Sequence, residues 1–538
     1  MKKRDITMIL KYFKVVIVRL DRTIRIRKLL ESKNPDSPIE SGNDRPGENY
    51  TGNCEGSGYK RASRRKDQVY GLCGVIIVLA SLVLSGCSLA PEYSRPDAPV
   101  PASWPSGPEY QDTGGKPGDM PAADICWRDY FTDERLQKVI GLALANNRDL
   151  RMATLNIERT RALYRIQRAE LLPTVDAGGV FSKERIPGAV SGDGKPATSE
   201  IYSVNLGISS WELDLFGRIR NLKDAALQEY LATEQARLAT QISLVAEVAN
   251  TYLTLAADRG LLKLAQETLK AQEATYNLIR RRYEVGASSE LDLRQAQTRL
   301  EAARVDICRY SAVVAGDRNA LTLLVGSAVP EELLPEELST VTMANGLSPG
   351  LPAEVLQRRP DILQAEHRLM AANANIGAAR AALFPRIALT TSVGTMSDQL
   401  SGLFESGSDA WSFIPQVVMP VFDVRTRAAY DVAKSDREIL LAQYEKVVQV
   451  AFREVADALA QQGTLRDQMA AQQSLVEASA ESYRLSELRY QSGIDSYLHV
   501  LDAQRSLYGA QQGLIAVDLS RISNLVTLYK VLGGGAGE

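Results

Sequence analysis

Residues 149–173 read DLRMATLNIERTRALYRIQRAELLP, and residues 361–385 repeat the pattern as DILQAEHRLMAANANIGAARAALFP, a constant 212 positions later. Farther along the chain the two copies are 207 positions apart, since Glu247-Val248-Ala249 matches Glu454-Val455-Ala456. A repeat of this length is far too long for a solenoid unit, whose period is about 20–50 residues. The sequence therefore predicts two similar halves that form one pseudo-symmetric subunit.

Each half begins with a predicted helix, over residues 149–172 and 361–383, which ends at Pro173 or Pro385 because proline cannot continue a helix. Two segments of alternating polarity around a polar loop follow in each half. Their apolar and small residues alternate as Tyr202, Val204, Leu206 and Ile208 with Ser203, Asn205, Gly207 and Ser209, and as Ile387, Leu389, Thr391 and Val393 with Ala388, Thr390, Ser392 and Gly394. A return strand is expected at Trp411, Phe413, Val417, Met419 and Val421.

This alternation has a period of two, with one apolar face and one small polar face. It is typical of a β-strand between lipid and water, and the lengths suit tilted spans of about ten residues. A soluble hairpin that packs on a core shows the same alternation, so the pattern by itself leaves both interpretations open.

Long helices are predicted after the strands, because no proline interrupts residues 218–283. Apolar residues recur there every seven positions, at Leu231, Leu238, Val245 and Tyr252, and after a shift of three at Leu262, Leu269, Tyr276 and Tyr283. Such spacing predicts a coiled-coil seam with a stammer. Some 65 residues at about 1.5 Å each would extend about 100 Å. The second half repeats the helix over residues 427–490. Turns at 285–289 and 492–496 lead into return helices that end near Val325 and Leu532.

Composition limits the chemistry that the chain can perform. The 538 residues carry 63 Lys+Arg against 65 Asp+Glu, a balance that gives no support for nucleic-acid binding. Two histidines and five scattered cysteines without a CxxC pair argue against metal sites and imidazole catalysis. Counting does not exclude chemistry by carboxylates alone, so a carboxylate-based hydrolase is a third alternative, but no clustered acids lie on the predicted elements. We expect no enzyme activity, no metal and no cofactor. Whether Cys126 and Cys308 form a disulfide is left open.

The N-terminal region resembles a lipoprotein signal. A basic cluster at 61–66 precedes a 14-residue apolar run, 71–84, which is too short to span a bilayer of about 30 Å as a helix. The run ends in Leu84-Ser85-Gly86-Cys87, which is similar to the lipobox at which bacterial lipoproteins are cleaved and acylated on cysteine. A secretory signal with a coincidental cysteine and a short buried helix are the alternatives. We interpret 61–86 as the signal peptide and 1–60 as a non-functional extension.

The remaining chain divides by composition and by the repeat. Eight of the 22 prolines lie between residues 88 and 121, which favours an extended strap. The predicted divisions are a lipid-anchored strap and equatorial segment at 87–135, a first repeat at 136–330, an equatorial linker at 331–352, a second repeat at 353–532 and a flexible tail at 533–538.

Three motifs resemble the outer membrane factor family, the TolC-like channels, and especially the OprM-like lipoproteins of multidrug efflux systems. They are SWELDLFGRIR (210–220), LQRRPDI (356–362) and RYQSGIDSYLHVLDAQRSLY (489–508), and the match covers essentially all of 87–538. The resemblance implies a mainly α-helical homotrimer, with a 12-stranded outer-membrane barrel and a long coiled-coil tunnel through the periplasm. It also implies docking to a periplasmic adaptor and to an inner-membrane proton-driven pump of the RND type.

The strand count independently supports an oligomer. Each chain offers four strands, whereas a closed membrane barrel needs at least about eight, and open edges in lipid leave backbone groups unpaired. The barrel must therefore be shared between chains. Two chains would supply eight strands and three would supply twelve, and only the resemblance selects three.

The expected function is passive conduction of small molecules from the pump and adaptor to the outside of the bacterial cell. One alternative is the outer-membrane duct of a type I protein secretion system. Another is a periplasmic coiled-coil lipoprotein that conducts nothing, against which the polar strand residues Ser203, Asn205 and Ser209 argue.

The two turns between the long helices are the candidate contacts with the adaptor. Gly286 and Gly493 occupy equivalent positions where a helix reverses, and glycine tolerates the left-handed conformation that such an end often needs. A purely structural role explains them as well. The resemblance places adaptor contacts at these turns, with Val285, Gly286, Ser288, Ser289, Ser492, Gly493 and Ser496 as the candidate residues.

A gate is expected near the second turn. His499 and Asp502 are three residues apart and share a helix face, so three copies would form rings there. The resemblance places constricting aspartates at these two positions, and Asp292 and Gln295 are the first-half equivalents. It also implies a latch in which the hydroxyl of Tyr490 bonds the carboxylate of Asp292. The alternative is that Tyr490 only packs in the seam and that Asp502 is solvated.

Overall fold

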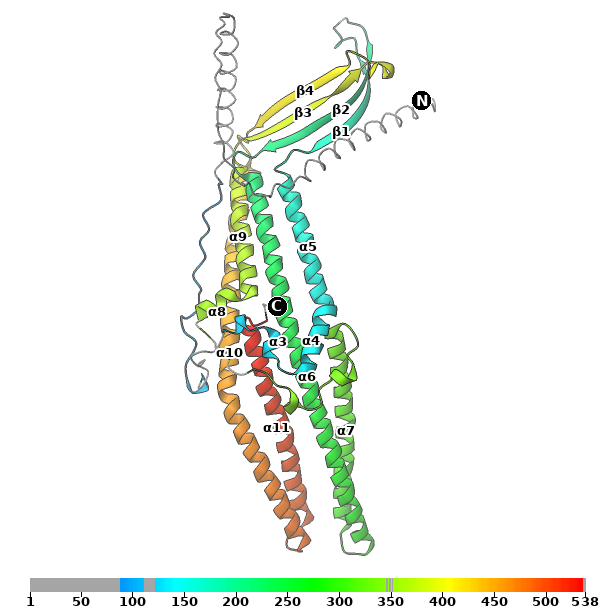
Figure 1. The fold of residues 1–538 in the computed structure, drawn as a ribbon, viewed down its shortest axis with the longest axis vertical. Helices are drawn as coiled ribbons and strands as arrows, with labels where there is room; N and C mark the ends of the chain where they lie inside the picture. Colours follow the sequence, from blue (N-terminus) through cyan, green and yellow to red (C-terminus); the bar gives the residue numbers. More distant parts are fainter. Residues whose placement is uncertain are drawn as a thin grey trace, which may run out of the picture. The chain divides into compact units, whose positions relative to one another are not determined.

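Four strands form one antiparallel sheet in the order β1-β2-β3-β4, and each repeat contributes a hairpin to it (Figure 1). The strands are β1 (Val175–Ile186), β2 (Ala197–Leu213), β3 (Arg386–Ser397) and β4 (Asp409–Val418). The computed structural model describes residues 88–110, 121–192, 194–344, 347, 350 and 352–535. All of these belong to the second of two compact units, Met1–Ile77 and Val78–Glu538. Cys87, the signal peptide and the extension 1–60 lie outside the described residues.

The register of the sheet separates its two faces. Ala177, Leu206, Val393 and Trp411 pair across all four strands, and the neighbouring row consists of Gly178, Asn205, Gly394 and Ala410. Because side chains alternate along a strand, one row is apolar and the next is small and polar. The predicted return strand is confirmed to Val417 but is wrong beyond it. Met419 and Val421 lie outside β4, since Pro420 cannot donate a ladder hydrogen bond.

Close approach of the backbones explains the glycines in the two central strands. A Cβ on Gly394 would lie 2.0 Å from the carbonyl oxygen of Val204, and one on Gly207 would lie 2.7 Å from that of Thr391. A bulge between Ile208 and Trp211 places Ser210 at a φ of 54°. Glycines and bulges of this kind allow a sheet to curve.

The long helices predicted from the repeat are present. They are α5 (Arg148–Ala169), α6 (Arg218–Glu284) and α7 (Glu290–Val325) in the first half, and α9 (Pro360–Ala381), α10 (Val424–Gln491) and α11 (Tyr497–Val531) in the second. The sheet lies at one end of α5, α6, α9 and α10, and the turns α6–α7 and α10–α11 lie at the opposite end of the helices (Figure 1). None of the helices in the described part of the chain is both long and apolar enough to cross a bilayer.

The starts of these helices follow local chemistry. The side chain of Asn147 accepts a hydrogen bond from the backbone N–H of Leu150 at the start of α5, and Pro360 occupies the first turn of α9. Gly217, in the left-handed conformation, precedes α6. The remaining helices are short: α3 (Trp127–Tyr130), α4 (Glu134–Asn146), α8 (Pro352–Arg358), and the 3₁₀ turns Pro108–Tyr110, Ala122–Asp124, Glu331–Leu333, Leu338–Thr340 and Leu400–Gly402. The predicted division after residue 135 falls inside α4.

The predicted seam of α6 is correct in the middle of the helix and shifted beyond it. Of its first four residues, Val245 and Tyr252 are buried, whereas Leu231 and Leu238 are only half-buried. Ile242, Ala249 and Ala256, which follow the same seven-residue spacing on the adjacent seam position, are buried as well. Beyond Gly260 the buried residues are Ala265, Gln272 and Ile279, each three positions after a predicted one, whereas Tyr283 is exposed. Near its end α6 has fewer neighbouring helices, so only the face that carries Ala265, Gln272 and Ile279 is covered.

The main core lies midway along the helices, where α3, α4, α6 and α11 meet. Tyr130 stacks on Tyr529 with ring centroids 4.1 Å apart, and Phe131 and Tyr252 complete the aromatic centre. The hydroxyl of Tyr529 donates to the carbonyl of Ile125 at 2.7 Å. This core joins the two repeats at the level of the equatorial segments.

The proline-rich strap is extended over residues 88–107 and binds along α9. Glu366 on α9 is buried and accepts two hydrogen bonds from Arg95, both at 2.7 Å, and one from Tyr93 at 3.2 Å. Nearer the sheet, Ser88 donates to the side chain of Asn221 at 2.8 Å. Because Asn221 lies in the first turn of α6, the strap begins next to the point where the sheet ends.

Candidate gate at the helical tips

The two turns at the ends of the hairpins have the same geometry. We call residues 285–289 the first tip and 492–496 the second tip. Gly286 and Gly493 have φ angles of +73° and +74°, the left-handed values expected for them. The backbone N–H of Ala287 donates to the backbone carbonyl of Arg282 at 2.7 Å, and the N–H of Ile494 donates to the carbonyl of Arg489 at 2.9 Å. This pattern closes a helix that ends at glycine. Apart from the adjoining residues, no heavy atom of the described chain lies within 4 Å of a Cβ on either glycine, so the requirement is for the φ angle and not for space.

The charges at the two tips differ. In the first tip Ser289 caps α7 and forms a capping box with Asp292, whose Oδ2 accepts from the Ser289 hydroxyl at 2.8 Å. The equivalent pair in the second tip is Ser496 and His499, and the Ser496 side chain makes no cap hydrogen bond. There Arg489 instead binds Asp495 through two hydrogen bonds of 2.5 and 3.0 Å. This guanidinium holds the pKa of the Asp495 carboxyl below its usual value.

An aromatic cluster joins the two hairpins just above the tips. Its buried members are Ile279, Ala296, Tyr497, Val500 and Leu501, and Tyr276, Leu293, Tyr483 and Tyr490 pack around them. The rings of Tyr490 and Tyr497 are 5.4 Å apart, and the guanidinium of Arg282 lies 5.6 Å from the Tyr490 centroid. The contacts between the hairpins at this level are therefore mostly apolar.

Of the predicted gate residues, two are exposed on α11 and one is half-buried on α7. His499 and Asp502 are both exposed on α11, whereas Val500 and Leu501 between them are buried, so the predicted shared face exists. Asp502 pairs with Arg505 at 3.0 Å on that face. Gln295 is half-buried on α7.

The expected hydrogen bond between Tyr490 and Asp292 is absent from the described residues of this chain. Asp292 directs its carboxylate to Ser288 and Ser289, where it closes the cap of α7. Tyr490 places its ring against Tyr497 and Arg282. The capping role of Asp292 was not predicted, although a serine three residues before an acid at a helix start is its usual sequence signal.

The motif LQRRPDI contains a clamp that the sequence did not assign. Arg359 is buried and binds Asp361 at 2.7 Å, Glu454 of α10 at 2.8 Å, and the carbonyl of Val531 at the end of α11 at 2.8 Å. It thereby joins three helices of the second repeat at the equatorial level. Arg358 beside it is exposed and pairs with Asp124 at 3.0 Å.

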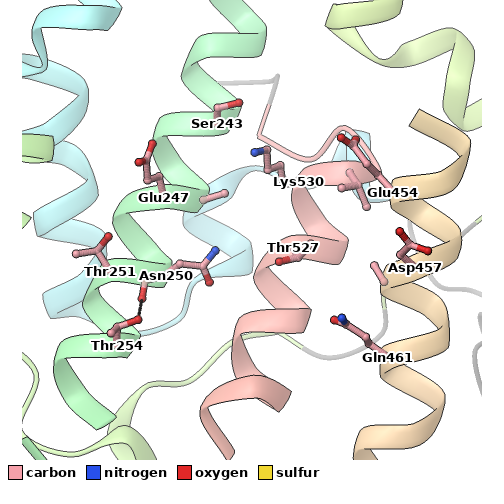
Figure 2. A pocket seen from close by; sticks show the side chains of 13 residues that line it. Ser243, Glu247, Asn250, Thr251, Thr254, Glu454, Asp457, Gln461, Thr527 and Lys530 are labelled. Atoms are coloured by element: carbon pink, nitrogen blue, oxygen red, sulfur yellow. Dashed lines mark hydrogen bonds between the residues drawn. The ribbon is translucent and has the colours of Figure 1, made fainter. Parts of the chain in front are cut away.

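A polar groove of about 510 Å³ lies beside this clamp, between α6, α10 and α11. Figure 2 shows Glu247 and Asn250 on α6 at one side, Glu454 and Asp457 on α10 at the other, and Lys530 of α11 between them. Glu247 and Glu454 are equivalent residues of the two repeats, as are Asn250 and Asp457. Equivalent positions of the two repeats therefore face the groove from opposite sides, and Glu247 and Glu454 are acidic at both.

The first hairpin also contains a pair of carboxyl groups, Asp258 on α6 and Asp317 on α7. Burial and the hydrogen bond to Asp317 raise the pKa of Asp258 to about 6, from an ordinary value of 3.8. A carboxyl whose pKa is raised by folding binds more protons in the folded state, so the stability of the fold falls as pH rises from about 4 to about 6 and is then constant.

We therefore expect Asp258→Asn to unfold at a higher temperature than the parent protein at pH 7.5, and at a similar temperature at pH 4. Circular dichroism of the helices during heating, at both pH values, measures this difference. The exposed Glu267→Gln on the same helix is the control and should change neither value. Equal melting temperatures of Asp258→Asn and the parent at pH 7.5 would contradict the interpretation of the pair.

Most of the chain is similar in sequence and in fold to known proteins. The family model of the outer membrane efflux proteins matches residues 139–327 and 351–534. The antibiotic efflux pump outer membrane protein ArpC and the toluene efflux pump outer membrane protein TtgC, both of Pseudomonas putida, are each 50% identical over 461 residues, which is 85% of this chain and 95% of theirs. The open state of the MtrE outer membrane channel of Neisseria gonorrhoeae superposes with a TM-score of 0.75 at 40% identity, covering 84% of this chain and 99% of MtrE.

Proposed function

This chain belongs to the outer membrane efflux protein family, and from that premise we propose that three copies of it form the exit duct of a tripartite efflux pump. The duct is passive and catalyses no reaction, since the pump supplies the energy. The relatives named for antibiotic and toluene efflux support small apolar molecules as its substrates. Neither a protein secretion duct nor a structural lipoprotein is favoured by these relatives.

The observation that carries the proposal is the sheet, which is apolar on one face and open at both edges. Trp411 is 79% exposed and Val393 is 64% exposed on the apolar row, while Ser392 and Ser412 join their hydroxyls at 2.8 Å on the other face. β1 and β4 are its edges. Edges of this kind cannot remain unpaired in lipid, so further copies of the chain must close the sheet. The polar face then lines an aqueous lumen.

The internal repeat indicates which surfaces meet between copies. Within the chain α6 packs on α9, and Gln228 of α6 contacts His367 of α9 at 2.7 Å. Ala225 and Ala232 of α6, one turn either side of Gln228, are buried. Their repeat equivalents on α10, Val432 and Ile439, are 58% and 56% exposed. We infer that α10 of one copy packs on α5 of the next, as α6 packs on α9.

A crosslinking experiment tests this arrangement. Ser435 and Leu155 are the repeat equivalents of Gln228 and His367. In a background of Cys126→Ser and Cys308→Ser, we expect Ser435→Cys with Leu155→Cys to give dimers and trimers with a short bifunctional thiol reagent. Gln228→Cys with His367→Cys is the matched control and should crosslink within one chain. Monomers alone from the first pair would contradict the packing of α10 on α5.

The lipid anchor and the adaptor contacts belong to the same proposal. Cys87 would carry the acyl chains, and Ser88 beside Asn221 supports an attachment point near the end of the sheet. Most residues of the first and second tips are exposed, and the tips lie farthest from the sheet, which supports their use by an adaptor (Figure 1).

Efflux in cells tests the function itself. The full-length protein should restore resistance to apolar antibiotics and to toluene in a strain that keeps an adaptor and pump of this class but lacks the outer membrane component. Cys87→Ser should lose labelling by palmitate. Export of a protein substrate without restored resistance would favour the secretion duct instead.

A further inference from the structure

Three arginines form one exposed face near the end of α5, which we call the arginine face. Arg161, Arg165 and Arg168 follow one another at spacings of four and three residues, so they lie on the same side of the helix. All three are exposed, and in the described part of the chain none of them makes an ion pair or a side-chain hydrogen bond. The face therefore carries three positive charges that no described acidic side chain pairs with.

The internal repeat shows what covers the same face of α9. The equivalents of the three arginines, 212 positions later, are Asn373, Gly377 and Arg380. The strap lies on them, since Asn373 donates to the carbonyl of Pro91 at 2.7 Å and Arg380 donates to that of Leu89 at 3.2 Å. A Cβ on Gly377 would lie 2.7 Å from the Cβ of Ala90. The strap thus occupies on α9 the face that remains open on α5.

The path of the strap indicates which way this face points in the duct. The strap continues from Cys87, which carries the acyl chains in the proposed function, so the strap runs along the outside of the duct. The other sides of α9 pack on α6 and on α10. In the proposed assembly α5 has the same surroundings, between α6 of its own copy and α10 of the next. Its arginine face therefore points outward as well.

The arginine face lies at the end of α5 that meets the sheet (Figure 1). α5 ends at Ala169 and β1 begins at Val175, and the three arginines cover about 10 Å of helix at about 1.5 Å per residue. Leu172, four residues beyond Arg168 and 69% exposed, continues the face toward the sheet with an apolar side chain. A headgroup layer is about 5–7 Å thick on each side of the hydrocarbon core. A sheet that spans the hydrocarbon therefore places these arginines among or just beneath the headgroups, within reach of their long side chains.

We propose that the arginine face binds the phosphate groups of anionic phospholipids in the periplasmic leaflet of the outer membrane. Guanidinium groups bind phosphate oxygens through two parallel N–H bonds, and basic side chains close to an anionic membrane surface are attracted to it. This inference rests on the proposed function, because the sheet must lie in the membrane for headgroups to occur at this level. With one arginine face from each copy, the duct is held at a fixed depth around its whole circumference.

Lipid selection by the purified full-length oligomer tests the inference. The oligomer is equilibrated in detergent micelles that contain equal amounts of phosphatidylglycerol and phosphatidylcholine and is then isolated again, and mass spectrometry quantifies the two lipids that it retains. We expect the parent protein to retain phosphatidylglycerol in excess. Arg165→Gln combined with Arg168→Gln should lower the affinity for phosphatidylglycerol about tenfold or more. The excess should also shrink in 1 M salt, where the Debye length falls from about 10 Å to about 3 Å.

The same helix supplies the matched control. Arg148→Gln combined with Arg151→Gln removes two exposed arginines from the opposite end of α5 and should leave the excess as in the parent. Arg165→Lys combined with Arg168→Lys keeps the charge and should keep most of the excess. Arginines near the end of a helix also stabilise its C-terminal dipole, but that role would change the melting temperature and not the choice of lipid.

Equal excesses of phosphatidylglycerol in the parent and in the Arg165→Gln, Arg168→Gln protein would overturn the inference, as would a parent without any excess. A parent that lacks the excess but cosediments with isolated peptidoglycan through the same two arginines would assign the face to the cell wall instead. The micelle assay does not depend on conduction. An oligomer that conducts without selecting the lipid overturns only this inference, whereas one that selects the lipid and passes no current contradicts only the duct.

Discussion

Gly394→Ala should nearly abolish the folded protein. The new Cβ would lie 2.0 Å from the carbonyl oxygen of Val204 and 2.6 Å from the Cα of Asn205. Both are backbone atoms of β2, so they can move away only if β2 and β3 separate. That pairing joins the sheet halves of the two repeats, and its loss leaves two isolated hairpins, which are at best marginally stable.

The measurement is the amount of oligomer extracted from outer membranes, and we expect it to fall at least tenfold. Gly179→Ala in β1 is the matched control, because the nearest atoms to its new Cβ are 3.8 Å away, an ordinary contact. The control should assemble normally. Normal amounts of oligomer from Gly394→Ala would show that the two central strands are not as close as described.

Arg359→Ala should lower the stability of the fold more than any other substitution considered except Gly394→Ala. Removal of the guanidinium leaves the carboxylate of Glu454, that of Asp361 and the carbonyl of Val531 without their shared partner. The guanidinium itself is buried, with 9% of the Arg359 side chain exposed, whereas the side chains of Asp361 and Glu454 are each 38% exposed. Water therefore screens the two carboxylates, and the loss comes mainly from the unpaired carbonyl of Val531 and from the packing of the arginine side chain. We expect a large fall in the melting temperature measured by circular dichroism.

The neighbouring residue supplies the control. Arg358→Ala removes an exposed ion pair, for which the typical cost is about 0–1 kcal/mol, and should melt close to the parent protein. Combining Arg359→Met with Glu454→Gln should recover part of the loss, because the carboxylate is then no longer left charged and alone. Similar melting temperatures for Arg358→Ala and Arg359→Ala would contradict the role of the clamp.

The repeat made most of the fold predictable. Proline-free heptads and two glycine turns located the long helices, and the return helix α7 ends at Val325 as expected. Period-two alternation located β2, β3 and most of β4. These features are local, since each depends on residues close together in the sequence.

The site was less predictable because it depends on contacts between distant segments. Sequence spacing placed His499 and Asp502 on one exposed face but could not show that Asp292 is engaged in capping α7. Tyr483, Tyr490 and Tyr497 are seven residues apart, a regularity that could have pointed to Tyr497 as a buried member of the seam. The clamp at Arg359 needed three helices in place before its partners could be identified.

Conduction by the purified full-length protein in planar lipid bilayers tests the central claim most directly. A shared barrel with a polar lumen predicts discrete, stepwise current increments, each from the insertion of one oligomer. An intact oligomer that inserts into the bilayer and passes no current would contradict the proposal that this chain forms a duct.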